Sequence, residues 1–376
     1  MITPAQFDEL LTPILALYDD FMVSVIKDIV RRLMKMNGMT ASAEWQINRL
    51  LEGGAVYDDI LDEFAILTGK ARTVIEQMFI QAGITSLKFD NKIYQAAGLK
   101  PLPIPLSPAM QRVLIEGIKK TMGEVVNLTL TTAIAGQDTF VQALDLAYMQ
   151  VTNGTMSYTQ AIKEGVKHIA DKGLSLVSYK HSKDQVDVAV RRAVLTGVSQ
   201  TVGQIQLDGI AESGLDLVQT SAHIGARPTH EVWQGRVFSL TGKTPGYPLF
   251  DETGYGTGPG LAGWNCRHSF YPFYPGVSEE LYSQSTLDEY AGKKLKYKGV
   301  VETFYEATQQ QREIERNIRK VKREAAGLAA AGLDNTEEVG KVHLLQALMR
   351  DFIGQTGLVR QPVREGGKVE IVRGDK

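Results

Sequence analysis

Cysteine is nearly absent from this sequence, and an apolar run long enough to cross a membrane is missing. The chain of 376 residues contains one cysteine, Cys266, which excludes an internal disulfide and suits a reducing compartment. The N-terminal stretch lacks the basic start of a secretory signal, because its first cationic side chain is Lys27. Asp19 and Asp20 interrupt its apolar stretch before the roughly eighteen residues that a membrane helix requires. We therefore expect a cytoplasmic product with no membrane anchor.

An excess of either charge is also missing. The formal net charge of −2 gives no bulk attraction to nucleic acid or to anionic membranes, so any basic contact surface must be local. The content of 43% apolar and 22% charged residues is typical of a globular protein, and the length allows two or three domains. We find no internal repeats.

Helical periodicity dominates the first 212 residues and returns near the C-terminus. The predicted fold class is α+β and predominantly α-helical, with long helices followed by a small loop-rich α+β core and a C-terminal helix pair. Four short helices are expected between residues 41 and 97, each closed by a glycine, and Ser157 is expected to cap a later helix. The expected helices cover residues 3–36, 41–52, 55–68, 70–82, 86–97, 107–135, 137–150, 157–171, 183–212, 299–328 and 336–353.

The pattern changes after Gly214. The segments "LDLVQTSAHIG" and "WQGRVFSL" are rich in β-branched and aromatic residues and predict strands, and the dense glycine, proline and tyrosine of residues 242–276 predict a long ordered loop. The prolines of "LKPLPIPLSP" predict an extended linker. The expected domains are an N-terminal helical module (1–100), this linker (101–107), a middle helical region (108–214), the core (215–290), charged helices (291–355) and a polar tail (356–376).

The loop contains "GYGTGPGLAGWNCRH", with a G-x-G-x-x-G pattern at Gly258, Gly260 and Gly263. A dinucleotide-binding turn requires a strand before the pattern and a helix after it. Pro259 lies inside the pattern and more prolines follow it, so the flanks do not fit. The "TGKT" segment at 241–244 also fails as a phosphate-binding loop, because the required earlier glycine is absent. We interpret the glycines as parts of a tightly folded irregular loop.

Three histidines share this region with the cysteine: His223, His230 and His268 accompany Cys266 in the pattern H-x6-H, 35 residues, C-x-H. Thiolate and neutral imidazole are the usual ligands of tetrahedral zinc, and four protein ligands describe a structural site. One alternative is a buried cysteine with ordinary hydrogen-bonded histidines. A second is a Cys–His nucleophile oriented by an Asn or Asp such as Asn265 or Asp251.

The run "HIGARPTHEVWQGRVFSL", followed by "GYGTGPGLAGWNCRHSFYPFYPGVS", resembles the signature of the phage minor capsid protein 2 family of tailed bacteriophages and prophages. The segment "IKDIVRRLMKMNGMTASAEWQINRLLEGG" is similar to the start of the same family, and the likeness extends to about residue 330. Beyond the four metal-ligand candidates, the motif positions are Gly225, Arg227, Pro228, Trp233, Gly235, Gly263, Trp264, Asn265 and Arg267.

The resemblance implies a non-enzymatic minor capsid or head-morphogenesis protein, present in the host cytoplasm during assembly and then in the phage head. It implies contacts with the portal protein, with the major capsid or scaffolding protein, or with a second copy of the chain. DNA contact through the basic residues of 293–323 is the weaker expectation.

A more distant likeness is to the phage head-morphogenesis domain, where His230 and His268 stand at the places of cysteines. Zinc tolerates this replacement and a nucleophile does not, which favours a structural Zn²⁺ ion as the cofactor. The alternative function is a Cys/His-centred or ADP-ribosyltransferase-like enzyme delivered with the phage genome. No NAD-site pattern is present to support it.

Overall fold

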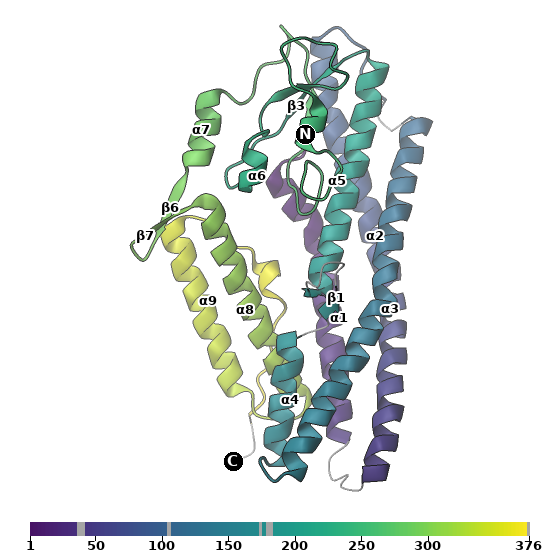
Figure 1. The fold of residues 1–376 in the computed structure, drawn as a ribbon, viewed down its shortest axis with the longest axis vertical. Helices are drawn as coiled ribbons and strands as arrows, with labels where there is room; N and C mark the ends of the chain where they lie inside the picture. The colour runs from purple at the N-terminus through teal and green to yellow at the C-terminus, as the bar shows by residue number, and fades with distance from the viewer. Residues whose placement is uncertain (36–41, 104–106, 173–174, 178–182, 374–376) are drawn as a thin grey trace. The chain divides into compact units, whose positions relative to one another are not determined.

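The computed structural model describes residues 1–35, 42–103, 107–172, 175–177 and 183–373, and within them the protein is mostly helical with small antiparallel sheets (Figure 1). The predicted fold class is confirmed. The predicted linker lies partly outside the described residues, because 104–106 are not among them. The longer helices are α1 (Pro4–Lys35), α2 (Ser42–Ala96), α3 (Pro108–Thr152), α4 (Tyr158–Lys172), α5 (Val186–Glu212), α8 (Phe304–Ala330) and α9 (Thr336–Thr356).

Shorter elements occupy the stretches between these helices. The described residues form three antiparallel sheets. They pair β1 (Ser175–Val177) with β2 (Lys183–Gln185), β3 (Leu217–Thr220) with β4 (Val237–Ser239) and β5 (Phe270–Pro272), and β6 (Lys294–Tyr297) with β7 (Val300–Thr303). The remaining elements are α6 (Pro228–Glu231), α7 (Gln284–Gly292) and the 3-10 turns η1 (Phe250–Thr253) and η2 (Pro362–Glu365). Within the described residues, no helix is long and apolar enough to span a membrane.

The chain forms two compact units, each built from three separate stretches. Unit 1 contains residues 1–13, 72–125 and 191–309, and unit 2 contains residues 14–71, 126–190 and 310–376. Each unit therefore depends on pairing between segments far apart in sequence.

The expected breaks in the second helical stretch are wrong. Residues 42–96 form one helix that runs through Gly53, Gly54, Gly69 and Gly83. A glycine in a helix interior costs only about 1 kcal/mol relative to alanine. Apolar side chains at helical spacing from Val56 to Tyr94 are buried, which outweighs four such penalties. The expected break near residue 136 in α3 is wrong for the same reason.

The predicted helix start at Ser157 and the C-terminal helix pair are confirmed. Ser157 accepts a hydrogen bond from the Gln160 N–H at 3.3 Å, and the Gln160 side chain accepts from the Ser157 N–H at 3.0 Å, which is a capping box at the start of α4. The charged helix begins at Phe304 rather than at residue 299, because residues 294–303 form the β6–β7 hairpin.

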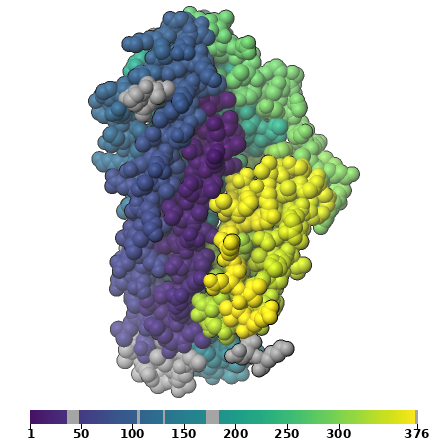
Figure 2. Space-filling model, turned by 180° about the vertical axis from the view of Figure 1, so that it is seen from behind, coloured from purple at the N-terminus to yellow at the C-terminus, as the bar shows by residue number. Residues whose placement is uncertain are grey.

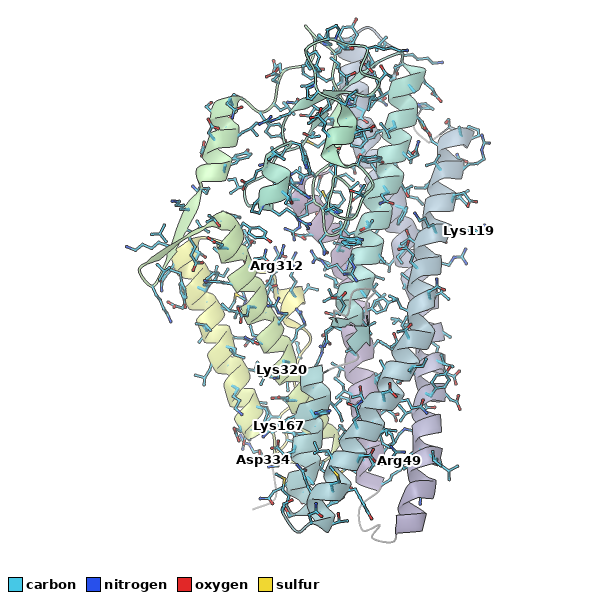
Figure 3. All side chains as sticks on the ribbon, viewed as in Figure 1. Arg49, Lys119, Lys167, Arg312, Lys320 and Asp334 are labelled. Carbon is cyan, nitrogen blue, oxygen red and sulfur yellow. The ribbon has the colours of Figure 1, made fainter. Side chains whose placement is uncertain are left out.

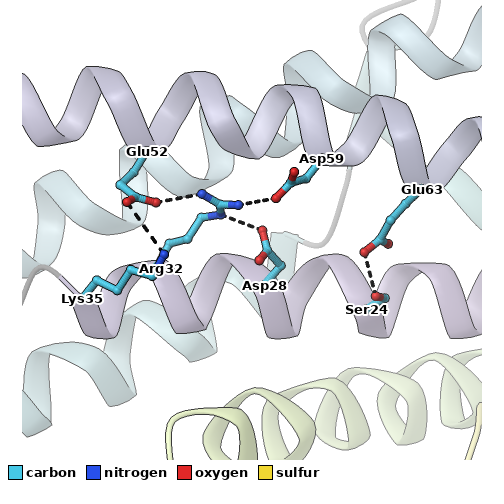
Figure 4. Close-up of polar contacts among 7 residues, drawn as sticks. All are labelled: Ser24, Asp28, Arg32, Lys35, Glu52, Asp59 and Glu63. Atoms are coloured by element: carbon cyan, nitrogen blue, oxygen red, sulfur yellow. Dashed lines mark hydrogen bonds and ion pairs between the residues drawn. The ribbon is translucent and has the colours of Figure 1, made fainter.

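In unit 2, ion pairs join α1 to α2 and α2 to α3. The guanidinium of Arg32 binds Asp28 and Glu52, both at 2.7 Å, and also Asp59 (Figure 4). Arg49, labelled in Figure 3, makes two bonds of 2.8 Å to the carboxylate of Asp145. Such two-bond pairs fix the register of neighbouring helices.

In unit 1, α3 and α5 approach closely through small residues. A Cβ on Gly117 would lie 2.0 Å from Thr201 Oγ1, and a Cβ on Gly197 would lie 2.0 Å from Thr121 Oγ1. Each glycine thus receives the threonine of the facing helix. This close packing positions the C-terminal part of α5, which leads directly into β3.

Both strands predicted after Gly214 are present, and they pair with each other. In the order β4-β3-β5, Val218 of β3 lies opposite Phe238 on one side and Pro272 on the other. Buried side chains of this sheet belong to two apolar clusters. The smaller contains Leu217, Val237 and Phe273. The larger consists of Ile210, Val218, Trp233, Phe238, Phe250, Leu261, Cys266 and Phe270. The cysteine is thus a member of the core of unit 1.

Candidate metal centre

The pairing of β3 with β5 brings together the segments that contain the cysteine and the histidines. Thr220, the last residue of β3, lies opposite Phe270, the first residue of β5. The contact continues one step further, where the Ser221 N–H donates to the Ser269 carbonyl at 2.8 Å. The chain that leaves β3 toward His223 and the chain that enters β5 from the cysteine therefore meet at one end of the sheet.

The short helix α6 places the second histidine at the same end. Pro228 occupies the first helical turn, where its missing N–H costs nothing, and Arg227 before it is extended. His230 follows two residues later with its ring buried. Trp233 packs against this ring at 4.6 Å between centroids and against the His268 ring at 4.8 Å, so one indole holds both imidazoles in place.

Three candidate ligands meet with the spacing of a tetrahedral metal site. The two Nδ1 atoms of His230 and His268 are 3.4 Å apart, and Cys266 Sγ lies 3.9 Å and 3.6 Å from them, respectively. A tetrahedral Zn²⁺ with bonds of about 2.3 Å to sulfur and about 2.05 Å to nitrogen holds two nitrogens about 3.4 Å apart, and a nitrogen and a sulfur about 3.6 Å apart. The observed triangle matches one face of that tetrahedron.

The outer ring nitrogens fix the tautomers. His230 Nε2 lies 2.7 Å from the Pro259 carbonyl oxygen, and His268 Nε2 lies 3.1 Å from Gln234 Oε1. Gln234 Oε1 also accepts the His223 backbone N–H at 3.1 Å, which identifies it as the amide oxygen. Both partners are acceptors, so each Nε2 carries the proton and each Nδ1 presents a lone pair to the centre. This is the outer-shell arrangement of metal-bound histidines.

Such a centre has too few hydrogen-bond donors. Two Nδ1 lone pairs and the sulfur face one another, and the single S–H of Cys266 can serve only one nitrogen. The three residues are each 2% exposed, so bulk water is excluded. A buried acceptor without a donor costs about 1–3 kcal/mol, whereas a bound cation would satisfy all three atoms.

Burial keeps the imidazoles neutral. It lowers the pKa of His230 to about 4 and lowers the pKa of His268 well below the ordinary value of 6.5, so neither ring gains a proton near neutral pH. Burial also raises the pKa of the Cys266 thiol, which disfavours a free thiolate nucleophile. Asn265 and Asp251, the orienting residues that a nucleophile would need, are both exposed. A metal ion would itself supply the charge that deprotonates the thiol.

His223, the fourth predicted ligand, lies beside this group and outside it. Its ring stacks on His268 at 4.3 Å between centroids, and its Nδ1 is 3.1 Å from the Ile224 carbonyl oxygen. The three residues whose ligand atoms converge are His230, Cys266 and His268.

The glycine pattern serves close backbone packing. A Cβ on Gly260 would lie 2.1 Å from the Gly254 carbonyl oxygen, and a Cβ on Gly263 would lie 2.1 Å from the Thr257 carbonyl oxygen. At Gly258, a Cβ would lie 2.8 Å from the Trp264 ring. The loop thus folds on itself without side chains between its turns. The chain continues from it into β5 rather than into a helix, so a dinucleotide turn is absent here.

Two more motif glycines allow close approaches around the centre. Gly225 has a φ of +77°, and a Cβ there would lie 2.5 Å from the Phe304 ring. Gly235 has a φ of +71°, and a Cβ there would lie 2.7 Å from Leu287. Substitution at either position would strain the backbone and displace a packed side chain.

The motif arginines hold the loop from outside. Arg227 donates to the Trp264 carbonyl at 2.8 Å, and Arg267 binds the Asp8 carboxylate at 2.8 Å. Asn265, between them in sequence, has a φ of +54°, a left-handed conformation that asparagine tolerates better than most residues. The Trp264 side chain is 53% exposed, which leaves it available for contact with another molecule.

Sequence reasoning missed two supporting residues. Gln234, whose side chain contacts the His268 ring, lies in the "WQGR" segment of the quoted motif. Its place in this motif could have indicated a role in the site. Asp216 accepts hydrogen bonds from Ser239, Thr241 and Thr244, which explains the "TGKT" segment as a loop organised by a carboxylate. These bonds lower the pKa of Asp216 below its usual range although desolvation opposes them.

Comparisons with known proteins show what the whole chain is similar to. Two proteins named structural protein are similar to the chain. That of Lactococcus phage LL-H is 23% identical over 358 residues, covering 92% of this chain and 91% of the relative. That of Lactococcus phage mv4 is 32% identical over 126 residues, covering 32% of this chain and 92% of the relative. No solved structure matches. Residues 2–354 match the phage minor capsid protein 2 family, and the chain belongs to that family.

Proposed function

We propose that the protein is a minor structural component of the phage head that acts through contacts with other head proteins. Family membership over residues 2–354 carries this proposal. The two similar proteins named structural protein support it. The expected partners are the portal protein, the major capsid or scaffolding protein, and a second copy of the chain. Its place would be the virion after assembly in the host cytoplasm, in a phage or an induced prophage.

The proposal includes a structural metal, Zn²⁺, bound by His230, Cys266 and His268. The ligand spacing and the shortage of donors support it. One thiolate and two neutral imidazoles form a donor set that zinc prefers. His223 would supply the fourth ligand after a rotation of its ring away from Ile224. The metal would hold unit 1 as a rigid platform, and this role needs no catalytic step.

The assembly role is tested by quantitative mass spectrometry of purified particles. We expect a fixed number of copies per particle in procapsids, in mature virions or in both. Absence from both kinds of particle would contradict the proposal. A phage with the gene deleted should yield fewer complete heads, and supplying the wild-type protein in trans should restore them.

The metal is tested separately by elemental analysis of the protein purified without added zinc. We expect one zinc per chain, lost in Cys266→Ser and retained in His343→Gln, a change at an exposed histidine of α9. His223→Ala should bind zinc more weakly, since three ligands would remain. Equal zinc content in His223→Ala and wild type, at every chelator concentration, would remove His223 from the site.

A further inference from the structure

Unit 2 contains a pocket between α1, α8 and the tail that follows η2. Its volume is about 320 Å³, and its lining includes Lys27 of α1, Arg323 of α8 and Lys368 of the tail. Figure 2 shows the C-terminal segment, in yellow, beside the purple first helix. The tail is attached there by a hydrogen bond of 2.9 Å from the Gly367 N–H to Asp19.

One buried guanidinium in this pocket has a free edge. Arg323 is 5% exposed, and its Nη1 donates to Gln185 at 3.1 Å. Its Nε and Nη2 have no hydrogen-bond partner among the residues that the structure describes. These two atoms form the edge with which arginine binds a carboxylate or a phosphate through two parallel bonds.

The nearby carboxylate does not satisfy that edge. Asp19 Oδ1 lies 3.6 Å from Arg323 Nη2, beyond hydrogen-bond distance, while its Oδ2 accepts the Gly367 N–H. A buried guanidinium with two unmet donors is costly, so an anion on this edge would be favoured.

The charge of the lining favours an anion with more than one negative charge. Five cationic side chains line the pocket and two carboxylates accompany them: Lys27, Arg319, Lys322, Arg323 and Lys368, with Asp19 and Asp20. Lys322 donates to the Gly366 carbonyl at 2.8 Å, so it helps to hold the tail over the pocket. Desolvation by burial lowers the pKa values of Arg319 and Lys322, the effect that a bound anion would reverse.

We propose that this pocket binds a phosphate group on the Nε–Nη2 edge of Arg323, with Lys27 and Lys368 contributing from its rim. A tetrahedral oxyanion can accept two parallel bonds from that edge and still present oxygens to the lysines. The site lies within unit 2 and does not depend on the proposed metal or on the assembly role.

The test is calorimetric titration of the full-length protein with inorganic phosphate at constant ionic strength, with chloride as the reference anion. We expect saturable binding of one phosphate per chain and a rise in melting temperature in phosphate over chloride. Arg323→Gln should weaken binding by about tenfold or more, because it removes a two-bond charged contact. Arg350→Gln, at an exposed arginine of α9, is the matched control and should bind like wild type.

A second variant covers the case in which Arg323→Gln fails to fold. Lys27→Gln combined with Lys368→Gln changes only the rim, so it should fold like wild type in chloride and bind phosphate more weakly. A parallel titration with a short single-stranded oligonucleotide identifies the kind of molecule that supplies the phosphate group. Binding of inorganic phosphate indicates a free phosphate or a small phosphate ester. Binding of the oligonucleotide alone indicates nucleic acid. Absence of binding by both, or binding unchanged in Arg323→Gln and in the rim variant, would overturn the proposal.

Discussion

Removing the proposed metal from unit 1 should loosen the sheet that supports the candidate site. The perturbation is a chelator applied to the wild-type protein, compared with Cys266→Ser without chelator. Without an ion, one S–H faces two Nδ1 acceptors in a site that excludes water. One acceptor stays unsatisfied, which costs about 1–3 kcal/mol. Metal binding relieves this cost, which is therefore part of the binding free energy, and loss of a ligand present at about 100 times its dissociation constant removes about 2.7 kcal/mol. We expect a loss of that size.

Hydrogen exchange measured peptide by peptide locates this loss better than a global melting curve, because the chain forms two units. Amides of β3 and β5, where Thr220 pairs with Phe270, should exchange faster by about a hundredfold on chelation. Amides around Arg32 in unit 2 should keep their rates. Added zinc should restore protection in wild type but not in Cys266→Ser. Unchanged exchange in β3 and β5 after verified zinc removal would refute the structural role of the metal.

Three further predictions concern stability and zinc binding. Arg32→Met should lower the free energy of unfolding, measured by urea titration, by about 2 kcal/mol. This value lies between those typical of exposed and of buried ion pairs, because the three partners of Arg32 are partly exposed. Arg72→Met, which removes an exposed pair within one helix, should change the free energy of unfolding by less than about 0.5 kcal/mol, and equal losses would contradict the argument. Burial raises the pKa of Asp90 to about 7, so between about pH 4 and pH 7 the folded state holds a proton that the unfolded chain has lost. The stability that Asp90 contributes should therefore fall by about 2–3 kcal/mol from pH 5 to pH 8, which is measured as the change with pH in the difference between wild type and Asp90→Asn, and parallel profiles would exclude Asp90. Gly260→Ala should abolish zinc binding because its Cβ would lie 2.1 Å from a backbone carbonyl oxygen, whereas Gly292→Ala meets no atom within 4 Å and should bind zinc normally.

Periodicity predicted where helices exist better than where they end. The glycines inside residues 42–96 were interpreted as helix stops, yet the helix continues through them. Burial of its apolar face outweighs the free-energy cost of glycine in a helix. That burial depends on distant segments, which a local pattern does not contain. The capping box at Ser157 is a local hydrogen-bond pattern and was therefore predictable.

In the candidate site, too, local sequence predicted the residue types but not the contacts that depend on the fold. The residue types and order of His230, Cys266 and His268 indicated a metal, and the structure brings these three residues together. Their tautomers depend on the Pro259 carbonyl and on Gln234, contacts that only the folded loop creates. Sequence spacing alone also gave no means to separate His223, whose backbone hydrogen bond to Gln234 leaves its ring stacked outside the group.

The position of the centre in the chain shows what a metal would add to this core. His230 and Cys266 enclose 35 residues, a loop whose only regular elements after α6 are β4 and a 3-10 turn. Ordering a loop of that length costs about 3 kcal/mol of closure entropy beyond a constant. The loop buries Trp233, Phe238, Phe250 and Leu261 in the core of unit 1, while its glycine turns contact one another through backbone atoms. A metal bound by residues at both ends of the loop would offset this closure entropy through one set of metal–ligand bonds. The exposed side chain of Trp264 would stay available to a partner.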